Sequence, residues 1–117
     1  MDKSTLEKVA EFICGDDQTI APIYRSSSAL TQFFGRIGVE AIHDGSTREW
    51  WTLDVLMRLS KNQQFDVIKR LASPMEYGGD LEQIKLAQQS LNAILFIEGL
   101  RMGYNGTDPI IERFEPS

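Results

Sequence analysis

The chain has 117 residues, of which 42% are hydrophobic and 25% are charged, and its formal net charge is −5. The length is close to the commonest size of a single domain, and the composition is that of an ordinary globular protein. Broad binding to nucleic-acid phosphates needs a basic face, which the acidic balance of this chain disfavours. We therefore expect residues 1–117 to form one small globular domain.

The cysteine content and the apolar runs limit the cellular setting. A single cysteine, Cys14, excludes an intramolecular disulfide and a cysteine-rich zinc site. It lies near the end of an apolar helical pattern, which predicts a buried structural thiol. No signal-peptide core is visible at the N-terminus, and the longest apolar runs are too short to cross a bilayer. These features predict a cytoplasmic protein that does not enter a membrane.

Helical periodicity and N-cap signals predict five helices. The first begins at Ser4, which opens an S-x-x-E sequence of the capping-box type, and Gly15 is expected to end it. Ser26–Ser28 offer several N-caps for a short second helix, which ends near Gly35. Both helices carry apolar side chains at helical spacing, as a helix that packs on a core requires.

Three further helices follow in the second half of the chain. Ser46 opens another S-x-x-E sequence and predicts the N-terminus of the third helix. The fourth is expected from residue 62 or 63 to about Ala72, where a Ser-Pro sequence stops it. Asp80 is expected to cap the last helix, which has the clearest apolar stripe in the chain and ends near Gly99.

The C-terminal region has a different pattern. Apolar and other residues alternate from Leu100 to Tyr104, and Asn105-Gly106 is typical of a tight turn. Pro109 on the return segment indicates an edge position or the start of a strand. The predicted fold is therefore mainly α, with about five helices and a small C-terminal β-hairpin. This α+β arrangement is compatible with a winged-helix-like domain.

The residues that could carry catalysis are few. Arg36 and His43 match a loose ribonuclease spacing, but Gly38 and the Asp44-Gly45 turn interrupt the helix that should hold both groups. The serine cluster lacks a G-x-S-x-G context, and no phosphate-binding glycine loop occurs. One histidine and one cysteine cannot make a typical zinc site. We expect no enzyme, no cofactor and no metal site, and keep the Arg36/His43 ribonuclease as the weakest hypothesis.

Nucleic-acid binding is an alternative from a different class. In a winged-helix arrangement the last helix would enter the major groove of DNA. Amide side chains can read adenine edges, although affinity still depends on contacts with phosphates. This helix supplies many amides and few cations: Gln83, Lys85, Gln88, Gln89 and Asn92.

Aromatic and cationic residues near the predicted loops and helix starts suggest a binding surface. Trp50 and Trp51 point about 100° apart on a helix, where Trp50 shares a face with Leu53 and Trp51 with Val55. Two buried rings would be core anchors, whereas an exposed Trp51 beside Arg48 would suit a protein-binding hot spot. On the second interpretation the partner-binding residues are Tyr24, Arg25, Arg48 and Trp51.

Four motifs occur in a fixed order along nearly the whole chain. They are FICGD (Phe12–Asp16), YRSSSALTQFFGRIG (Tyr24–Gly38), STREWW (Ser46–Trp51) and LNAILFIEGLRMGYNG (Leu91–Gly106). Together they resemble a small N-terminal module that precedes other domains in bacterial abortive-infection proteins of the AbiJ type. The resemblance implies an accessory or sensing domain attached to an effector, often a HEPN-type nuclease, and transfers no catalytic residue to this chain.

Besides the ribonuclease, which is the weakest hypothesis, these observations lead to two functional hypotheses. The first is a non-catalytic bacterial module that binds a protein partner or an adjoining effector domain and regulates that effector in phage defence. The second is a small winged-helix-like nucleic-acid-binding domain. An acidic helical protein with exposed apolar groups can also form a homodimer. A clustered basic face would favour the second hypothesis, and exposed apolar surface near the tryptophans would favour the first.

Overall fold

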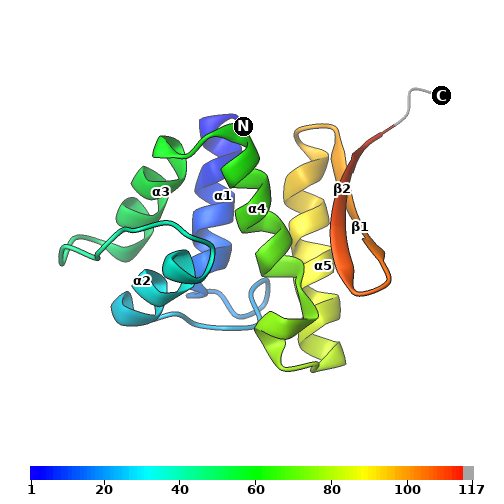
Figure 1. The fold of residues 1–117 in the computed structure, drawn as a ribbon, viewed down its shortest axis with the longest axis horizontal. Helices are drawn as coiled ribbons and strands as arrows, with labels where there is room; N and C mark the ends of the chain where they lie inside the picture. The colour runs from blue at the N-terminus through cyan, green and yellow to red at the C-terminus, as the bar shows by residue number, and fades with distance from the viewer. Residues whose placement is uncertain (115–117) are drawn as a thin grey trace.

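The computed structural model describes residues 1–114 and has the predicted mainly helical α+β architecture (Figure 1). Five α-helices and one short 3₁₀ helix precede a two-stranded antiparallel hairpin. In chain order the elements are α1 (Lys3–Cys14), α2 (Ser27–Arg36), α3 (Arg48–Arg58), α4 (Lys61–Ala72), η1 (Pro74–Tyr77), α5 (Leu81–Phe96), β1 (Leu100–Asn105) and β2 (Asp108–Arg113).

The helices pack side by side, and the hairpin covers one side of the bundle. Figure 1 shows α2 and α3 at one end, α1 and α4 in the middle, and α5 between these helices and the hairpin. α1 packs against α3 and α5, while α4 packs against α5 and β2. The fully buried large side chains come from all five α-helices, so a single core joins both ends. They include Phe12, Phe33, Phe34, Leu56, Ile68, Leu71 and Leu91.

The hairpin is attached to the bundle by two polar side chains. The amide of Asn92 on α5 both donates to the main-chain oxygen of Met102 (3.3 Å) and accepts from its main-chain nitrogen (2.6 Å). The hydroxyl of Tyr104 donates to the main-chain oxygen of Ala72 at 2.8 Å. In the ladder, Asn105 pairs with Asp108, so the turn falls one residue later than the Asn-Gly signal predicted.

Two of the predicted helix starts are wrong. The N-cap of α1 is Asp2, whose carboxylate accepts from the main-chain nitrogen of Ser4, so the helix begins before Ser4 can cap it. α3 begins at Arg48 and has no side-chain cap. The hydroxyl of Ser46 instead donates to the carboxylate of Asp44 at 2.5 Å. In both places the serine donates a hydrogen bond to an aspartate two residues earlier, because the charged carboxylate oxygens are strong acceptors.

The other predicted caps are correct. The side chain of Ser26 accepts from the main chain at the start of α2, and Asp80 does the same for α5. α4 begins at Lys61, slightly earlier than expected, because Ser60 and Gln63 form a capping box. Cys14 is fully buried at the end of α1, as its position in the apolar pattern predicted.

Candidate functional site

Three of the four predicted partner-binding residues gather at the C-terminal end of α1, where they hold the fold together. This end of the helix is closed by Gly15, which has a left-handed φ of 73°. A Cβ atom on Gly15 would lie 1.9 Å from the main-chain oxygen of Ile23, so the connection after α1 can approach only a glycine. Tyr24 and Arg25 follow directly in this connection, and Arg25 donates from its main-chain nitrogen to Cys14 at 3.0 Å.

The guanidinium of Arg48 joins the start of α3 to this helix end. It donates to the main-chain oxygens of Cys14 (2.7 Å) and Arg25 (3.0 Å from Nε) and to the carboxylate of Asp16 (2.8 Å). Its carbon Cζ lies 4.4 Å from the centre of the Tyr24 ring, within the range of a cation–π contact. These contacts occupy the guanidinium within the fold, and Tyr24 alone of this group is largely exposed.

Arg25 is buried, and its side chain contacts residues of α1, α2 and η1. Its Nη1 donates to the main-chain oxygen of Ile13 at 3.0 Å, and its Nη2 pairs with Glu76 at 3.0 Å. The guanidinium also lies over the Phe33 ring, 4.8 Å from its centre. A buried arginine with all these partners anchors the core and is not available to a protein partner.

The two tryptophans have opposite exposures, and the exposed one is not Trp51. Trp51 is only 7% exposed and packs edge-on against Phe34, with ring centres 5.7 Å apart. Trp50 is 74% exposed. The reason is that α3 turns the side of Trp51 and Val55 toward α1, which places the side of Trp50 toward solvent. Trp51 is thus buried in the core. This position does not support the hypothesis that Trp51 forms an exposed binding hot spot.

Trp50 lies on a shallow groove between α1 and α3, which we call the acidic groove. Its volume is about 280 Å³. The lining residues are Glu7, Ala10 and Glu11 from α1 and Glu49, Trp50 and Leu53 from α3. Among residues 1–114, none of the three glutamates forms a salt bridge with a lysine or arginine. The groove therefore combines a large exposed aromatic ring with unneutralised negative charge.

The electrostatics of Glu49 show the effect of this arrangement. Its pKa is raised above the usual value, mainly by partial burial and further by the negative charges of Glu11 and Asp16. The nearby Arg48 lowers the pKa, but this effect is smaller than those of burial and of the two acidic neighbours. A cation placed in the groove would stabilise the ionised form of Glu49.

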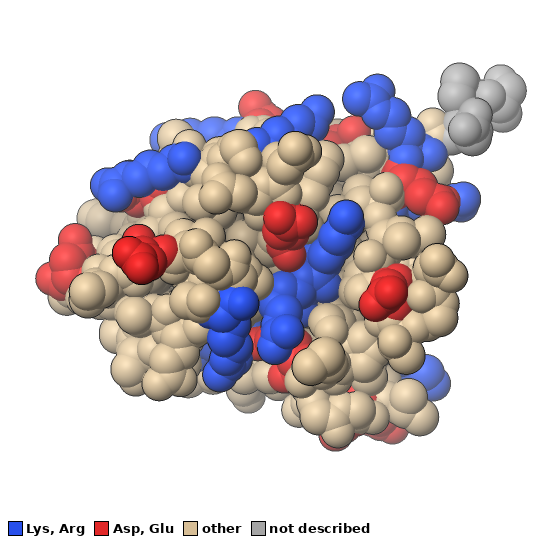
Figure 2. Space-filling view, in the orientation of Figure 1, with Lys and Arg blue, Asp and Glu red and all other residues tan. Residues whose placement is uncertain are grey.

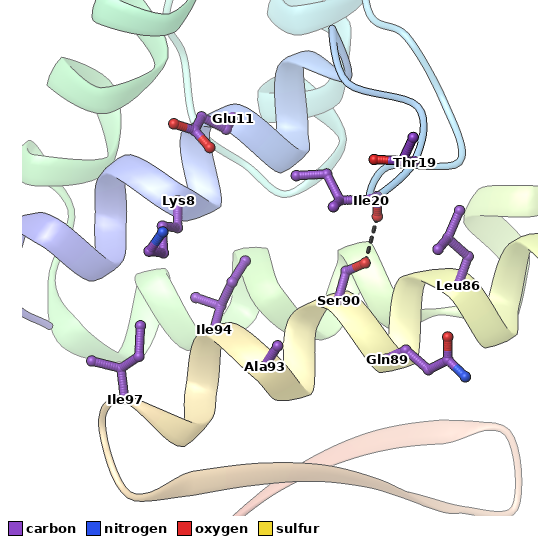
Figure 3. Close-up of a pocket in the computed structure, with 10 residues that line it drawn as sticks. All are labelled: Lys8, Glu11, Thr19, Ile20, Leu86, Gln89, Ser90, Ala93, Ile94 and Ile97. Atoms are coloured by element: carbon purple, nitrogen blue, oxygen red, sulfur yellow. Dashed lines mark hydrogen bonds between the residues drawn. The ribbon is translucent and has the colours of Figure 1, made fainter.

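A second groove lies on the other side of α1, between α1 and α5 (Figure 3). Ile94 of α5 and Ile97, directly after this helix, form its apolar side, and Lys8 and Glu11 of α1 lie opposite. Within the groove, the hydroxyl of Ser90 on α5 donates to the main-chain oxygen of Ile20 at 2.5 Å. Glu11 lines both grooves, so the exposed side of α1 forms a ridge between them.

The structure also places the residues of the nucleic-acid-binding hypothesis, on α5, and of the ribonuclease hypothesis, Arg36 and His43. In α5, Lys85 is the only Lys or Arg, and Asn92 is engaged by the hairpin. Arg36 ends α2 and lies 3.6 Å from the carboxylate of Glu76. His43 belongs to the loop before α3, where its ring contacts Trp51 with centres 5.0 Å apart. Arg36 and His43 thus turn to different neighbours and do not share a helix.

Comparisons with protein-family models, curated proteins and solved structures gave no match. The resemblance to AbiJ-type modules accordingly stays a prediction from the motifs. Within the described residues, no helix combines the length and apolar character needed to cross a membrane. The same residues contain no group of three or more His, Cys, Asp or Glu side chains that could hold a metal ion.

Proposed function

We propose that the chain is a non-catalytic interaction module whose acidic groove binds a basic, amphipathic segment of a partner protein or of an adjoining effector domain. The observation that carries this proposal is the exposure of Trp50 beside Glu7, Glu11 and Glu49. Solitary exposed apolar residues are common on proteins, but a tryptophan in a groove with charged walls is typical of a binding surface.

The aromatic part of the surface would supply affinity. Burying an exposed aromatic ring contributes roughly 2 kcal/mol, and a tryptophan loses little conformational entropy when it is fixed. Leu53 lies in the same groove, and Met57 is exposed one turn further along α3. An apolar side chain of the partner could pack against this strip, as in other helix-in-groove complexes.

The charged part of the surface would supply specificity. Glu7 and Glu11 are one helical turn apart on α1 and face Glu49 across the groove. Three unpaired carboxylates attract lysine and arginine and repel acidic segments, including other copies of this acidic chain. The pKa of Glu49, raised mainly by burial and further by Glu11 and Asp16, supports this argument, because a cationic partner would offset the repulsion among these carboxylates.

The wider biological setting belongs to the same proposal. A bacterial source and the regulation of an effector in phage defence are supported by the four motifs that resemble AbiJ-type modules, and a cytoplasmic location is part of the same proposal. The effector would then provide the basic segment, either within the same polypeptide or on a separate protein. Nucleic-acid binding is the less favoured alternative, because α5 contributes a single cation.

Selection of displayed helical peptides against the purified chain tests the proposal. The enriched peptides should be basic and should carry apolar residues along one helical face. Their Kd should rise at least about tenfold with W50A, and also with Glu7 and Glu11 both changed to Lys. M75A removes another exposed apolar side chain, on η1, and should leave the Kd unchanged.

Two results would contradict the proposal. One is a set of enriched peptides without positive charge, or peptides whose Kd does not respond to W50A. The other is a homodimer in sedimentation that W50A dissociates, which would make a second copy of the chain the occupant of the groove.

A further inference from the structure

Three arginines converge on one buried carboxylate on a different part of the molecule. Glu76, on η1, has a side chain that is only 3% exposed. One of its oxygens lies 3.0 Å from Arg25 and 3.6 Å from Arg36, and the other accepts from Nε of Arg70 at 2.7 Å. We call these four residues the arginine cluster. They join the connection after α1, the end of α2, the end of α4 and η1.

The cluster carries an excess of positive charge. Arginine stays protonated at every physiological pH, so the three guanidinium groups outnumber the single carboxylate by two charges. Burial would by itself raise the pKa of Glu76, but the hydrogen bonds from Arg25 and Arg70 outweigh it and lower the pKa. The carboxylate is therefore ionised at neutral pH and neutralises only one of the three arginines. This local excess contrasts with the net charge of −5 for the whole chain.

The arginines differ in the hydrogen-bond donors they still present. Arg25 is buried and uses both terminal nitrogens, on Ile13 and Glu76. Arg70 uses only Nε, and its side chain is partly exposed. Arg36 is 52% exposed and makes no hydrogen bond within the described residues, only the 3.6 Å ion pair. The outer edge of the cluster thus offers the donors of Arg36 and the terminal nitrogens of Arg70.

We propose that the outer edge of the arginine cluster binds a compact phosphate-type oxyanion between Arg36 and Arg70. The guanidinium fork matches the oxygens of a phosphate, and two unneutralised charges suit a dianion. Glu76 would hold the inner sides of the arginines, so that their outer nitrogens are already oriented when the anion arrives. In Figure 2, basic side chains gather at the centre of one face, over α4, with acidic atoms beside them.

The size of the patch favours a small anion over a polymer. On the face drawn in Figure 2, the basic centre is surrounded by mostly uncharged surface with separate acidic side chains, and other basic side chains lie along the edge. A nucleic acid would have to extend its phosphates over this uncharged and acidic surface, whereas a phosphate monoester or a diphosphate would occupy the basic centre alone. The site is independent of the acidic groove, because it is built from α2, α4 and η1 instead of α1 and α3.

Calorimetric titration of the chain with pyrophosphate and with inorganic phosphate, at constant ionic strength, tests this inference. Pyrophosphate should bind saturably with one site per chain. R36Q should weaken that binding by about tenfold or more, because it removes a charge and a bidentate donor. R36K keeps the charge but lacks the guanidinium fork, so its affinity for pyrophosphate should lie between those of the wild type and R36Q.

R58Q is the matched control. Arg58 is an exposed arginine on α3 that pairs with Asp54, and its removal lowers the net charge by the same amount. Equal weakening by R36Q and R58Q would mean a general charge effect and would overturn the proposal. The absence of saturable pyrophosphate binding would also overturn it, leaving the cluster as a structural ion network. A single-stranded oligonucleotide that binds where pyrophosphate does not would replace the compact anion with nucleic acid.

Discussion

Arg48 donates hydrogen bonds from Nε (3.0 Å) and Nη2 (2.5 Å) to the main-chain oxygen of Arg25, which comes much earlier in the chain. Arg25 in turn donates from its own side chain to Ile13, one residue before the last residue of α1. The final carbonyls of a helix lack partners and carry the negative end of its dipole. The two arginines supply both the donors and the positive charge that this end of α1 needs.

Loss of the Arg48 side chain should therefore destabilise the fold. We expect R48A to lower the free energy of unfolding by about 2 to 3 kcal/mol, because it removes hydrogen bonds to carbonyls and leaves some of them without a partner. Urea denaturation followed by circular dichroism would measure the change. R58A removes a largely exposed arginine from the same helix and should change stability by less than about 0.5 kcal/mol. Equal effects of the two substitutions would contradict the structural role of Arg48.

Gly15 offers a second test of the same junction. G15A must place a Cβ atom 1.9 Å from the oxygen of Ile23 and must keep a φ of 73°. G38A has a similar φ of 81° but meets no atom within 4 Å. We expect G38A to cost about 1 kcal/mol for its backbone conformation and G15A to cost at least about 3 kcal/mol. Thermal denaturation of both variants separates the steric effect from the conformational one, and equal losses would refute the close approach.

The sequence predicted the elements of this fold better than its surfaces. Apolar spacing located all five helices and the hairpin, because helix and strand periods are local properties. The caps at Ser4 and Ser46 were wrong because Asp2 and Asp44, two residues earlier in each case, accept hydrogen bonds from the serines. A capping motif alone does not show which neighbouring side chain will accept the hydrogen bonds at the start of the helix.

The surfaces depend on residues that only the folded chain brings together. α3 carries apolar side chains on two faces, so its sequence could not decide whether Trp50 or Trp51 would face α1. The i,i+4 pair of Glu7 and Glu11 was visible in the sequence, but its position opposite Trp50 was not. The partners of Glu76 are likewise distant in sequence, and no local pattern indicated that they would meet.

The pKa of Glu76 makes a prediction about acid denaturation. Its pKa is lower in the folded state than in the unfolded state, because the hydrogen bonds from Arg25 and Arg70 outweigh burial. The stability it contributes is therefore fully present above the unfolded pKa and is lost as the pH falls through the folded pKa. E76Q should cost about 3 kcal/mol at pH 7, since it leaves the buried Arg25 without its counterion.

The measurement for Glu76 is the free energy of unfolding between pH 7 and pH 3 for the wild type and E76Q. The difference between the two proteins should shrink as the pH falls below the usual glutamate range. E112Q is a useful control, because Glu112 forms an exposed ion pair with Arg101 on the hairpin. A difference between wild type and E76Q that stays constant over this pH range would show that charge on Glu76 is not what stabilises the cluster.

Glu49 should show the opposite dependence on pH. Its folded pKa is raised by burial and by Glu11 and Asp16, so the folded state loses stability relative to the unfolded state as the pH rises from the unfolded pKa through the folded one. E49Q removes this charge and should stabilise the protein at pH 7 by up to about 0.5 kcal/mol, a small effect because the side chain is partly solvated. The gain should disappear at a pH below the unfolded pKa, and E40Q, at an exposed loop position, serves as the control substitution.

The same E49Q variant relates stability to binding. If the acidic groove receives a basic segment, E49Q should weaken the binding of the selected peptides while it stabilises the free chain. A residue that costs stability in the free protein and gains a partner in the complex is typical of a binding site. Parallel measurement of unfolding and of peptide affinity would show both effects in one variant. Stabilisation with unchanged affinity would remove Glu49 from the binding surface and leave only Trp50, Glu7 and Glu11 to form it.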